Sequence, residues 1–446
     1  MSRARAHDLW RRFLNPDYVG LLEALDFGRA FVRAEGARLW DESGREYTDF
    51  LAGFGVHNQG HNHPRLVAAL GAALESRRPS MLNVDAPLEA GLLAERLAGL
   101  AGAGLCRTAF ANSGAEAVEI AIQAARAATG RSALLSCDGA YHGLSAGALS
   151  LMGRAERRRP FEPLLAGCGQ VPFGDAAALA AACERLTPAA FFVEPVQGEG
   201  GVNVPPGPYL GEAARICRRS GCLLVLDEIQ TGLGRTGAAF ATDLREVRPD
   251  ALLVGKALSG GMVPVAAAML TAEVWGRSFA GPERCRQHTS TFAGGLLAMV
   301  AGLETLAVLQ AEGLAARAAE LGAELLAGLK DLAGKHSVIR GVRGRGLLLG
   351  VEFEPPGTLL GLALPGSARA ALYAQVVSAI LLAEHGFLTQ PCSLAPAVLR
   401  IEPPLVIGRE DSARFLAALD RTLARCPSPG SAALAAFRQR LLGTGL

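Results

Sequence analysis

The sequence predicts an α/β protein with a larger domain, whose central sheet is mostly parallel, and a smaller α+β domain built from both chain ends. The chain has 446 residues, more than one ordinary domain, and half of them are hydrophobic. From about residue 90, short apolar runs alternate with helical patterns, which is typical of parallel strands covered by helices on both faces. We therefore expect an N-terminal segment (1–60) that joins the smaller domain, a larger domain (61–319) and a C-terminal smaller domain (320–446).

The first predicted element is a hairpin. Residues 31–40 and 47–51 read as strands on either side of the turn segment Asp41–Gly44. The strands expected in the larger sheet are residues 108–110, 133–136, 190–193, 223–226, 251–254 and 266–270. Helices are expected between them, for example over 115–128 and 211–219. Ligands of such sheets bind at the carboxyl ends of the strands.

The pattern changes again after about residue 320. A helix (315–332), one strand (341–353), another helix (368–385) and another strand (397–401) predict the smaller α+β domain. The tail after Pro427-Ser-Pro-Gly430 is expected to form one short exposed helix.

Composition argues against several kinds of partner and site. Lys and Arg (44) nearly balance Asp and Glu (42), so nothing indicates a nucleic-acid or membrane partner. The sequence shows neither an apolar run that we expect to span a bilayer nor the apolar core of a signal peptide. Its nine scattered cysteines lack metal-ligand spacing, so we expect reduced thiols, no metal and a cytoplasmic protein.

Two segments carry the strongest chemical signal. Residues 223–237 form an apolar strand that ends in Asp227-Glu228 before a glycine-rich loop. Residues 251–261 form a second apolar strand, after which Lys256 precedes small residues. An isolated Asp at the end of a strand would more often cap that strand. An isolated Lys after a strand could extend its aliphatic chain so that the ammonium group reaches solvent. A desolvated lysine has a lowered pKa, which suits Schiff-base chemistry.

Together the two segments, with Asp227 and Lys256 placed 29 positions apart, resemble the signature of the class III, or ω-, aminotransferases of fold type I. The similarity extends from Gly55–Pro64 to Arg400–Val406. The resemblance implies the cofactor pyridoxal 5′-phosphate, with Lys256 forming the internal aldimine and moving the substrate proton. It also implies Asp227 at the ring nitrogen, Gln230 at the phenolic oxygen and Glu194 close to the cofactor.

The resemblance extends to the cofactor's phosphate and ring. Ser113, Gly114 and Ala115 would hold the phosphate at a helix start, although Ser113 alone would be read as an ordinary N-cap. Tyr141 would stack on the ring with His142 beside it, although a lone Tyr-His pair is more often core. Thr291 would reach the partner subunit's phosphate, which implies a homodimer with shared active sites. Its loop departs from the family, because Gly295-Leu296 replaces the usual Asn-Pro.

Three residues bear on the substrate. By resemblance, Arg400 binds a substrate carboxylate and Glu199 covers it when the substrate has none, although either residue alone would be read as a surface charge. Relatives that bind a distal carboxylate often carry Arg after Tyr/Phe-His-Gly, where this chain has Leu144. Leu144 therefore argues against acetylornithine, ornithine or γ-aminobutyrate as donor.

The sequence thus predicts a ping-pong ω-aminotransferase acting on a terminal amine (a diamine, an aliphatic amine or the matching aldehyde) and a keto acid such as 2-oxoglutarate or pyruvate. A class III aminomutase, racemase or decarboxylase would use the same Lys256–Asp227 pair and remains an alternative. A regulatory protein that binds the cofactor without turnover is a third, but the roughly 30 residues before the hairpin hold no DNA-binding module.

Overall fold

A computed structural model describes residues 2–81, 85–355 and 365–428. Its central feature is a seven-stranded sheet in the order β4-β10-β9-β8-β7-β5-β6. β10 is antiparallel to both of its neighbours, and all other pairs are parallel. The strands are β4 (Leu105–Ala111), β5 (Leu134–Cys137), β6 (Cys168–Val171), β7 (Ala190–Val193), β8 (Leu223–Asp227), β9 (Ala251–Val254) and β10 (Ala266–Thr271). The predicted mostly parallel sheet is confirmed.

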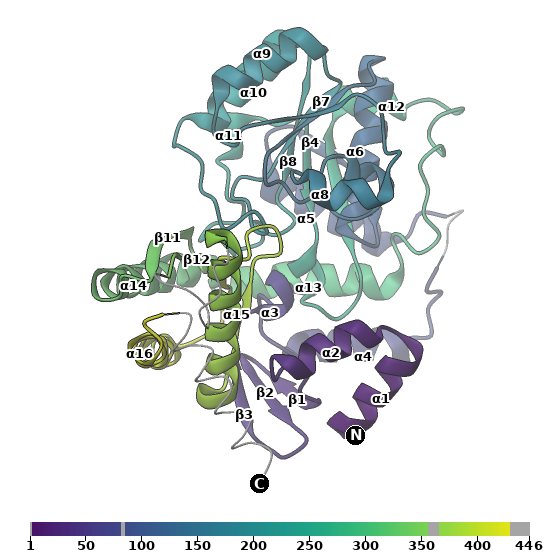
Figure 1. The fold of residues 1–446 in the computed structure, drawn as a ribbon. Helices are drawn as coiled ribbons and strands as arrows, with labels where there is room; N and C mark the ends of the chain where they lie inside the picture. Colours follow the sequence, from purple (N-terminus) through teal and green to yellow (C-terminus); the bar gives the residue numbers. More distant parts are fainter. Residues whose placement is uncertain (1, 82–84, 356–364, 429–446) are drawn as a thin grey trace.

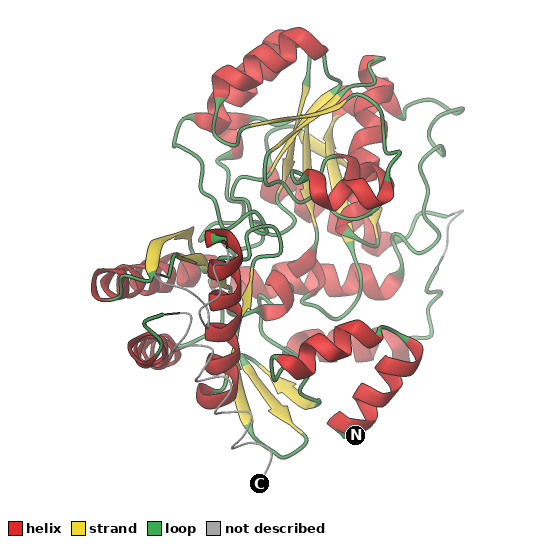
Figure 2. Ribbon diagram, in the orientation of Figure 1, coloured by secondary structure: helices red, strands yellow, loops and turns green. Residues whose placement is uncertain are grey.

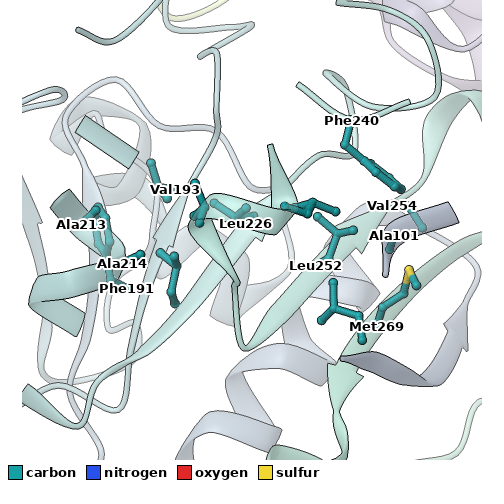
Figure 3. Packing of buried hydrophobic residues seen from close by; sticks show 14 of the residues in the cluster. Ala101, Phe191, Val193, Ala213, Ala214, Leu226, Phe240, Leu252, Val254 and Met269 are labelled. Carbon is teal, nitrogen blue, oxygen red and sulfur yellow. The ribbon is translucent and has the colours of Figure 1, made fainter. Parts of the chain in front are cut away.

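Helices cover both faces of this sheet (Figure 1). Alternate strand residues point to opposite faces, so Phe191 and Val193 pack in a cluster with α10, whereas Phe192 packs with α6 on the other side. Figure 3 shows part of the first cluster, including Phe191, Leu226 and Met269. The helices of this region are α5 (Leu88–Ala101), α6 (Gly114–Thr129), α7 (Ala146–Ser150), α8 (Ala155–Arg158), α9 (Ala176–Leu186), α10 (Tyr209–Ser220), α11 (Leu244–Val247), α12 (Ala272–Ser278) and α13 (Leu296–Ala311), with the 3-10 turns η1 (Arg159–Phe161) and η2 (Lys256–Ser259).

A second core forms around an antiparallel sheet in the order β11-β12-β15-β14 (Figure 2). Its strands are β11 (Ile339–Arg345), β12 (Leu348–Phe353), β14 (Gln390–Pro391) and β15 (Val398–Ile401), and its helices are α14 (Leu314–Lys335), α15 (Gly366–His385) and α16 (Arg409–Arg425). The single strand expected over 341–353 is wrong. The chain reverses at Gly346, whose φ is +57° and where an added Cβ would lie 2.4 Å from the Thr236 carbonyl carbon.

A third sheet joins an N-terminal segment to a strand from the C-terminal part of the chain. β3 pairs in parallel with β13, in the order β1-β2-β3-β13. The elements are α1 (Arg3–Phe13), α2 (Pro16–Ala24), β1 (Phe31–Glu35), β2 (Arg38–Asp41), β3 (Glu46–Asp49), the turn α3 (Ala52–Gly55), α4 (Pro64–Glu75) and β13 (Phe387–Leu388). The predicted hairpin is therefore three strands, because the chain also turns at Gly36 (φ +57°). The domain boundaries at residues 60 and 319 stay predictions.

The edge strand β6 and the apolar helix α15 add to what the sequence predicted. β6 was not expected, because this edge strand, Cys-Gly-Gln-Val, has no continuous apolar run. Within the described residues, α15 is long and apolar enough on composition alone to span a membrane. It nevertheless contributes Tyr373, Val377 and Ile380 to the second core, as a core helix does. The helix expected after Pro427–Gly430 lies outside the described residues.

Candidate active site

Three neighbouring parallel strands deliver the central residues of the site. Asp227 is the last residue of β8, Glu194 directly follows β7, and Lys256 follows β9 after Gly255. β8 pairs with both β7 and β9. Because the carboxyl ends of parallel neighbours lie at one edge of a sheet, the three side chains meet there.

Lys256 begins the turn η2 in a left-handed conformation, with φ +42°. Such a conformation in a residue with a side chain is uncommon and is concentrated at functional sites. Burial lowers the pKa of the Lys256 amine, although the charges of Glu402 and Glu199 oppose that effect. A lowered pKa leaves more of the amine uncharged and therefore nucleophilic.

Asp227 and His142 form a buried pair. Oδ2 of Asp227 lies 2.7 Å from Nδ1 of His142, and Oδ1 accepts a hydrogen bond from the Ile229 amide at 3.1 Å. Burial lowers the pKa of His142, but the hydrogen bond and the charge of Asp227 outweigh it, so the pKa lies above its usual value. The imidazole therefore supports the negative charge on Asp227.

Glu194 fastens the segment that carries His142. Its Oε1 accepts a hydrogen bond from the Tyr141 amide at 3.0 Å, and its Oε2 accepts one from the Gly198 amide at 3.2 Å. Burial raises the pKa of Glu194 to about 7, against the lowering influence of His142. Glu194 thus holds in place the segment of Tyr141 and His142, and with it the partner of Asp227.

The predicted phosphate segment lies at the start of α6. Ser113 is the N-cap, and its Oγ accepts a hydrogen bond from the Glu116 amide at 3.2 Å. The amides of Gly114 and Ala115 have no partner within the helix, as in every first helical turn, and they favour an anion. A Cβ at Gly143 would lie 2.7 Å from the Ala115 Cβ, so the Tyr141–Gly143 segment packs directly on this helix start.

Arg400 lies on β15, fully buried, and pairs through Nη1 with Glu199 Oε1. The second oxygen of Glu199 accepts a hydrogen bond from the Ser393 amide at 2.9 Å. Burial would raise the pKa of Glu199, but the charges of Arg400 and Lys256 lower it to about 2. The Phe54 ring lies 4.9 Å from the guanidinium carbon of Arg400. The structure thus brings the two residues together as predicted.

The remaining predicted residues are placed as follows. Gln230 is buried and donates through Nε2 to both oxygens of Glu402 at 3.1 Å. Tyr141 is half-buried. Leu144 is 66% exposed, and Thr291 lies on an exposed loop before α13. The neighbouring Ser290 accepts a hydrogen bond from Asn112 at 2.8 Å, so this loop touches the segment leading to Ser113.

Sequence reasoning missed Glu402. This fully buried carboxylate lies 3.4 Å from the Arg400 Nε and 3.9 Å from the Nε of the equally buried Arg235. A signal was present, because residues two apart in an extended segment share a face, and Glu402 directly follows the last residue of β15. Glu402 follows Arg400 at that interval.

These donors fit pyridoxal phosphate. An amine with a lowered pKa, a buried carboxylate at the same sheet edge and a helix start with unpaired amides suit its aldehyde, its ring nitrogen and its phosphate respectively.

The site agrees with the similarity to known proteins. The family model for "Aminotransferase class-III" matches residues 24–423. Aminotransferase PigE of Serratia sp. (strain ATCC 39006) is 35% identical over 94% of this chain, and the chain spans about half (53%) of that relative's length. Putrescine aminotransferase of Pectobacterium atrosepticum is 38% identical over 91% of this chain and 86% of the relative. Acetylornithine aminotransferase of Mycolicibacterium smegmatis is 39% identical over 88% and 93%.

Among solved structures, ornithine aminotransferase from Toxoplasma gondii ME49 superimposes with a TM-score of 0.82 at 34% identity, covering 95% of each chain. The α/β architecture is therefore that of fold type I, and the family uses pyridoxal phosphate. The alternative of an aminomutase, racemase or decarboxylase is not favoured by these relatives. By family model, sequence and fold, this chain belongs to the class III pyridoxal phosphate-dependent aminotransferases.

Proposed function

We propose that this enzyme is an ω-aminotransferase that moves an amino group between a terminal amine without an α-carboxylate and a keto acid such as pyruvate or 2-oxoglutarate. The observation that carries the proposal is the closed pair of Arg400 and Glu199 beside Lys256. With Glu199 in place, Arg400 is neutralised, and an amine that lacks a carboxylate leaves no buried cation unpaired. When a keto acid arrives, its carboxylate takes the place of Glu199 on the Arg400 fork.

The other residues act on protons and charge. Bound pyridoxal phosphate supplies the electron sink for the transfer. Lys256 would hold the cofactor through its amine and would serve as the base that moves the proton at the substrate carbon. Asp227, supported by His142, keeps a negative charge where the ring nitrogen needs its proton. Ser113, Gly114 and Ala115 would hold the phosphate at the start of α6, and Gln230 would donate to the phenolic oxygen.

Leu144 bears on the far end of the substrate. An aliphatic side chain directly after His142-Gly143 offers no charge to a distal carboxylate. We therefore favour a diamine or an aliphatic amine over acetylornithine, ornithine or γ-aminobutyrate. The name of the Pectobacterium relative, a putrescine aminotransferase, is in line with this choice, whereas that of the Mycolicibacterium relative is not.

We also infer a cytoplasmic homodimer in which Thr291 of each subunit reaches the other subunit's phosphate site. The exposure of the loop that carries Thr291 supports this proposal, because it leaves that loop accessible to a second subunit.

A coupled assay tests the proposal. The purified enzyme with added cofactor is offered putrescine, aliphatic monoamines and acetylornithine, each with pyruvate and with 2-oxoglutarate. We expect stoichiometric consumption of keto acid with putrescine or a monoamine. Activity with acetylornithine alone would refute the interpretation of Leu144, and activity without keto acid would refute transamination. Lys256→Ala, which removes the amine, should abolish both turnover and the visible absorption band of the bound cofactor.

A further inference from the structure

Glu402 joins three side chains around the active site. Both of its carboxylate oxygens accept a hydrogen bond from Gln230 Nε2. The carboxylate also lies 3.4 Å from the Nε atom of Arg400 and 3.9 Å from the Nε atom of Arg235. Its charge is also the largest influence that keeps the pKa of Lys256 up against burial. One carboxylate thus touches a residue expected at the cofactor and the expected carboxylate-binding arginine.

Glu402 has no space in which to move. Its side chain is fully buried, and a Cβ at Gly55 would lie only 2.4 Å from its Oε1. Arg235 is fixed as well, because its guanidinium donates to the Leu347 carbonyl at 3.0 Å and to the Pro403 carbonyl. Glu199 differs, because its carboxylate is held by Arg400 and by one loop amide, that of Ser393.

The count of buried charges gives Glu199 and Glu402 different roles. With Glu199 in place, the two buried guanidinium groups of Arg235 and Arg400 face two carboxylates. When Glu199 leaves, Glu402 stays, and the three ion-paired groups that remain carry one net positive charge. That charge matches a single substrate carboxylate.

We propose that Glu402 is a positioning residue: a fixed counter-ion, shared by Arg400 and Arg235, that orients Gln230 and supports positive charge at Lys256, while Glu199 is the counter-ion that moves. The proposal rests on the proposed function, since it assigns the roles of the two glutamates in that reaction.

The test uses the holoenzyme without substrate. The visible absorption band of the bound cofactor is titrated with pH for the wild type and for Glu402→Gln, which keeps the size of the side chain and removes its charge. Loss of a nearby negative charge disfavours protonation of the Lys256 nitrogen. The midpoint of the titration should therefore fall by about one pH unit, which is tenfold in proton affinity. An unchanged or raised midpoint would overturn the proposal.

Glu228→Gln is the matched control. Glu228 is as buried as Glu402, but it accepts from Thr231 Oγ1 and from the Ala241 and Thr242 amides, away from both arginines. It should lower the melting temperature and keep the wild-type midpoint. A midpoint that falls equally in both variants would mean a general effect of burying an amide and would also overturn the proposal.

If Glu402→Gln does not fold, Arg235→Gln/Glu402→Gln replaces it, because removing both partners of a buried pair leaves no unpaired charge. Its midpoint is compared with that of Arg235→Gln, because the loss of Arg235 removes a positive charge as well. The midpoint of the double variant should lie lower than that of Arg235→Gln, and an equal or higher midpoint would refute the role of Glu402. The titration needs bound cofactor but no turnover. An enzyme that shows the band yet transfers no amino group would therefore refute the proposed function while leaving the test of Glu402 intact.

Discussion

Glu199→Gln should tighten the binding of carboxylates to the resting enzyme. In the wild type, a carboxylate ligand must first displace Glu199 from Arg400. Breaking a buried pair by removing one partner costs about 3–5 kcal/mol. Because Arg400 still has the Glu402 carboxylate at 3.4 Å in this variant, we expect the lower end of that energy range. About 3 kcal/mol corresponds to roughly a 100-fold lower Kd. The same unpaired charge should lower the free energy of unfolding by a similar amount.

Propionate, an unreactive carboxylate, is the probe. Its Kd is measured by titration of the holoenzyme without an amine, and stability is measured by urea unfolding of the same samples. The pKa of Glu199 is about 2, so it stays ionised at any ordinary pH and should itself cause no change in Kd between about pH 5 and 9. An unchanged Kd in Glu199→Gln, or a wild-type Kd that falls steeply near neutral pH because Glu199 protonates, would refute this reasoning.

Three other outcomes are expected. Leu144→Arg should raise the activity ratio of acetylornithine over putrescine by about 10- to 100-fold, since a charge-assisted hydrogen bond is worth about 1.5–3 kcal/mol, whereas Leu144→Met should leave the ratio unchanged. Burial raises the pKa of Glu194 to about 7, so between about pH 4.3 and 7 the folded state binds a proton that the unfolded state has lost, and the free energy of unfolding should fall as the pH rises through this window. Glu194→Gln should flatten this slope when unfolding is measured as a function of pH, and an equal slope in the variant would contradict the reasoning. Gly346→Ala should cost about 1–3 kcal/mol more in thermal unfolding than Gly313→Ala, because both glycines have positive φ but an added Cβ meets nothing within 4 Å at Gly313; equal costs would refute the close approach.

Local patterns predicted the large sheet and the residues at its strand ends. Lys256 follows one apolar strand and Asp227 ends another, and these positions determine where their side chains lie. The reversal at Gly346 was missed because the apolar pattern continues across it and the cause of the turn is remote. It is a backbone contact with Thr236 that no local window contains. β6 was missed because an edge strand needs fewer apolar residues.

The charge network around Arg400 was harder to predict. Glu199 and Arg400 are 201 positions apart, and their pairing was expected only by resemblance. Glu402 contacts Gln230, which lies 172 positions earlier in the chain, in the loop after β8. The two-residue interval places Glu402 beside Arg400, but it does not predict contacts with Gln230 or Arg235, which arise when the second core packs against the glycine-rich loop after β8.

The antiparallel strand β10 has a consequence for repeated turnover. β10 returns beside β9, with Ala267 opposite Val254, so the peptide that carries Lys256 is hydrogen-bonded into the sheet before and after the lysine. A lysine at the free end of a loop would drift away whenever its bond to another molecule was broken. Here both anchors stay in the sheet, and only the flexible butyl chain swings. The Lys256 amine therefore stays within the reach of its own side chain from one turnover to the next.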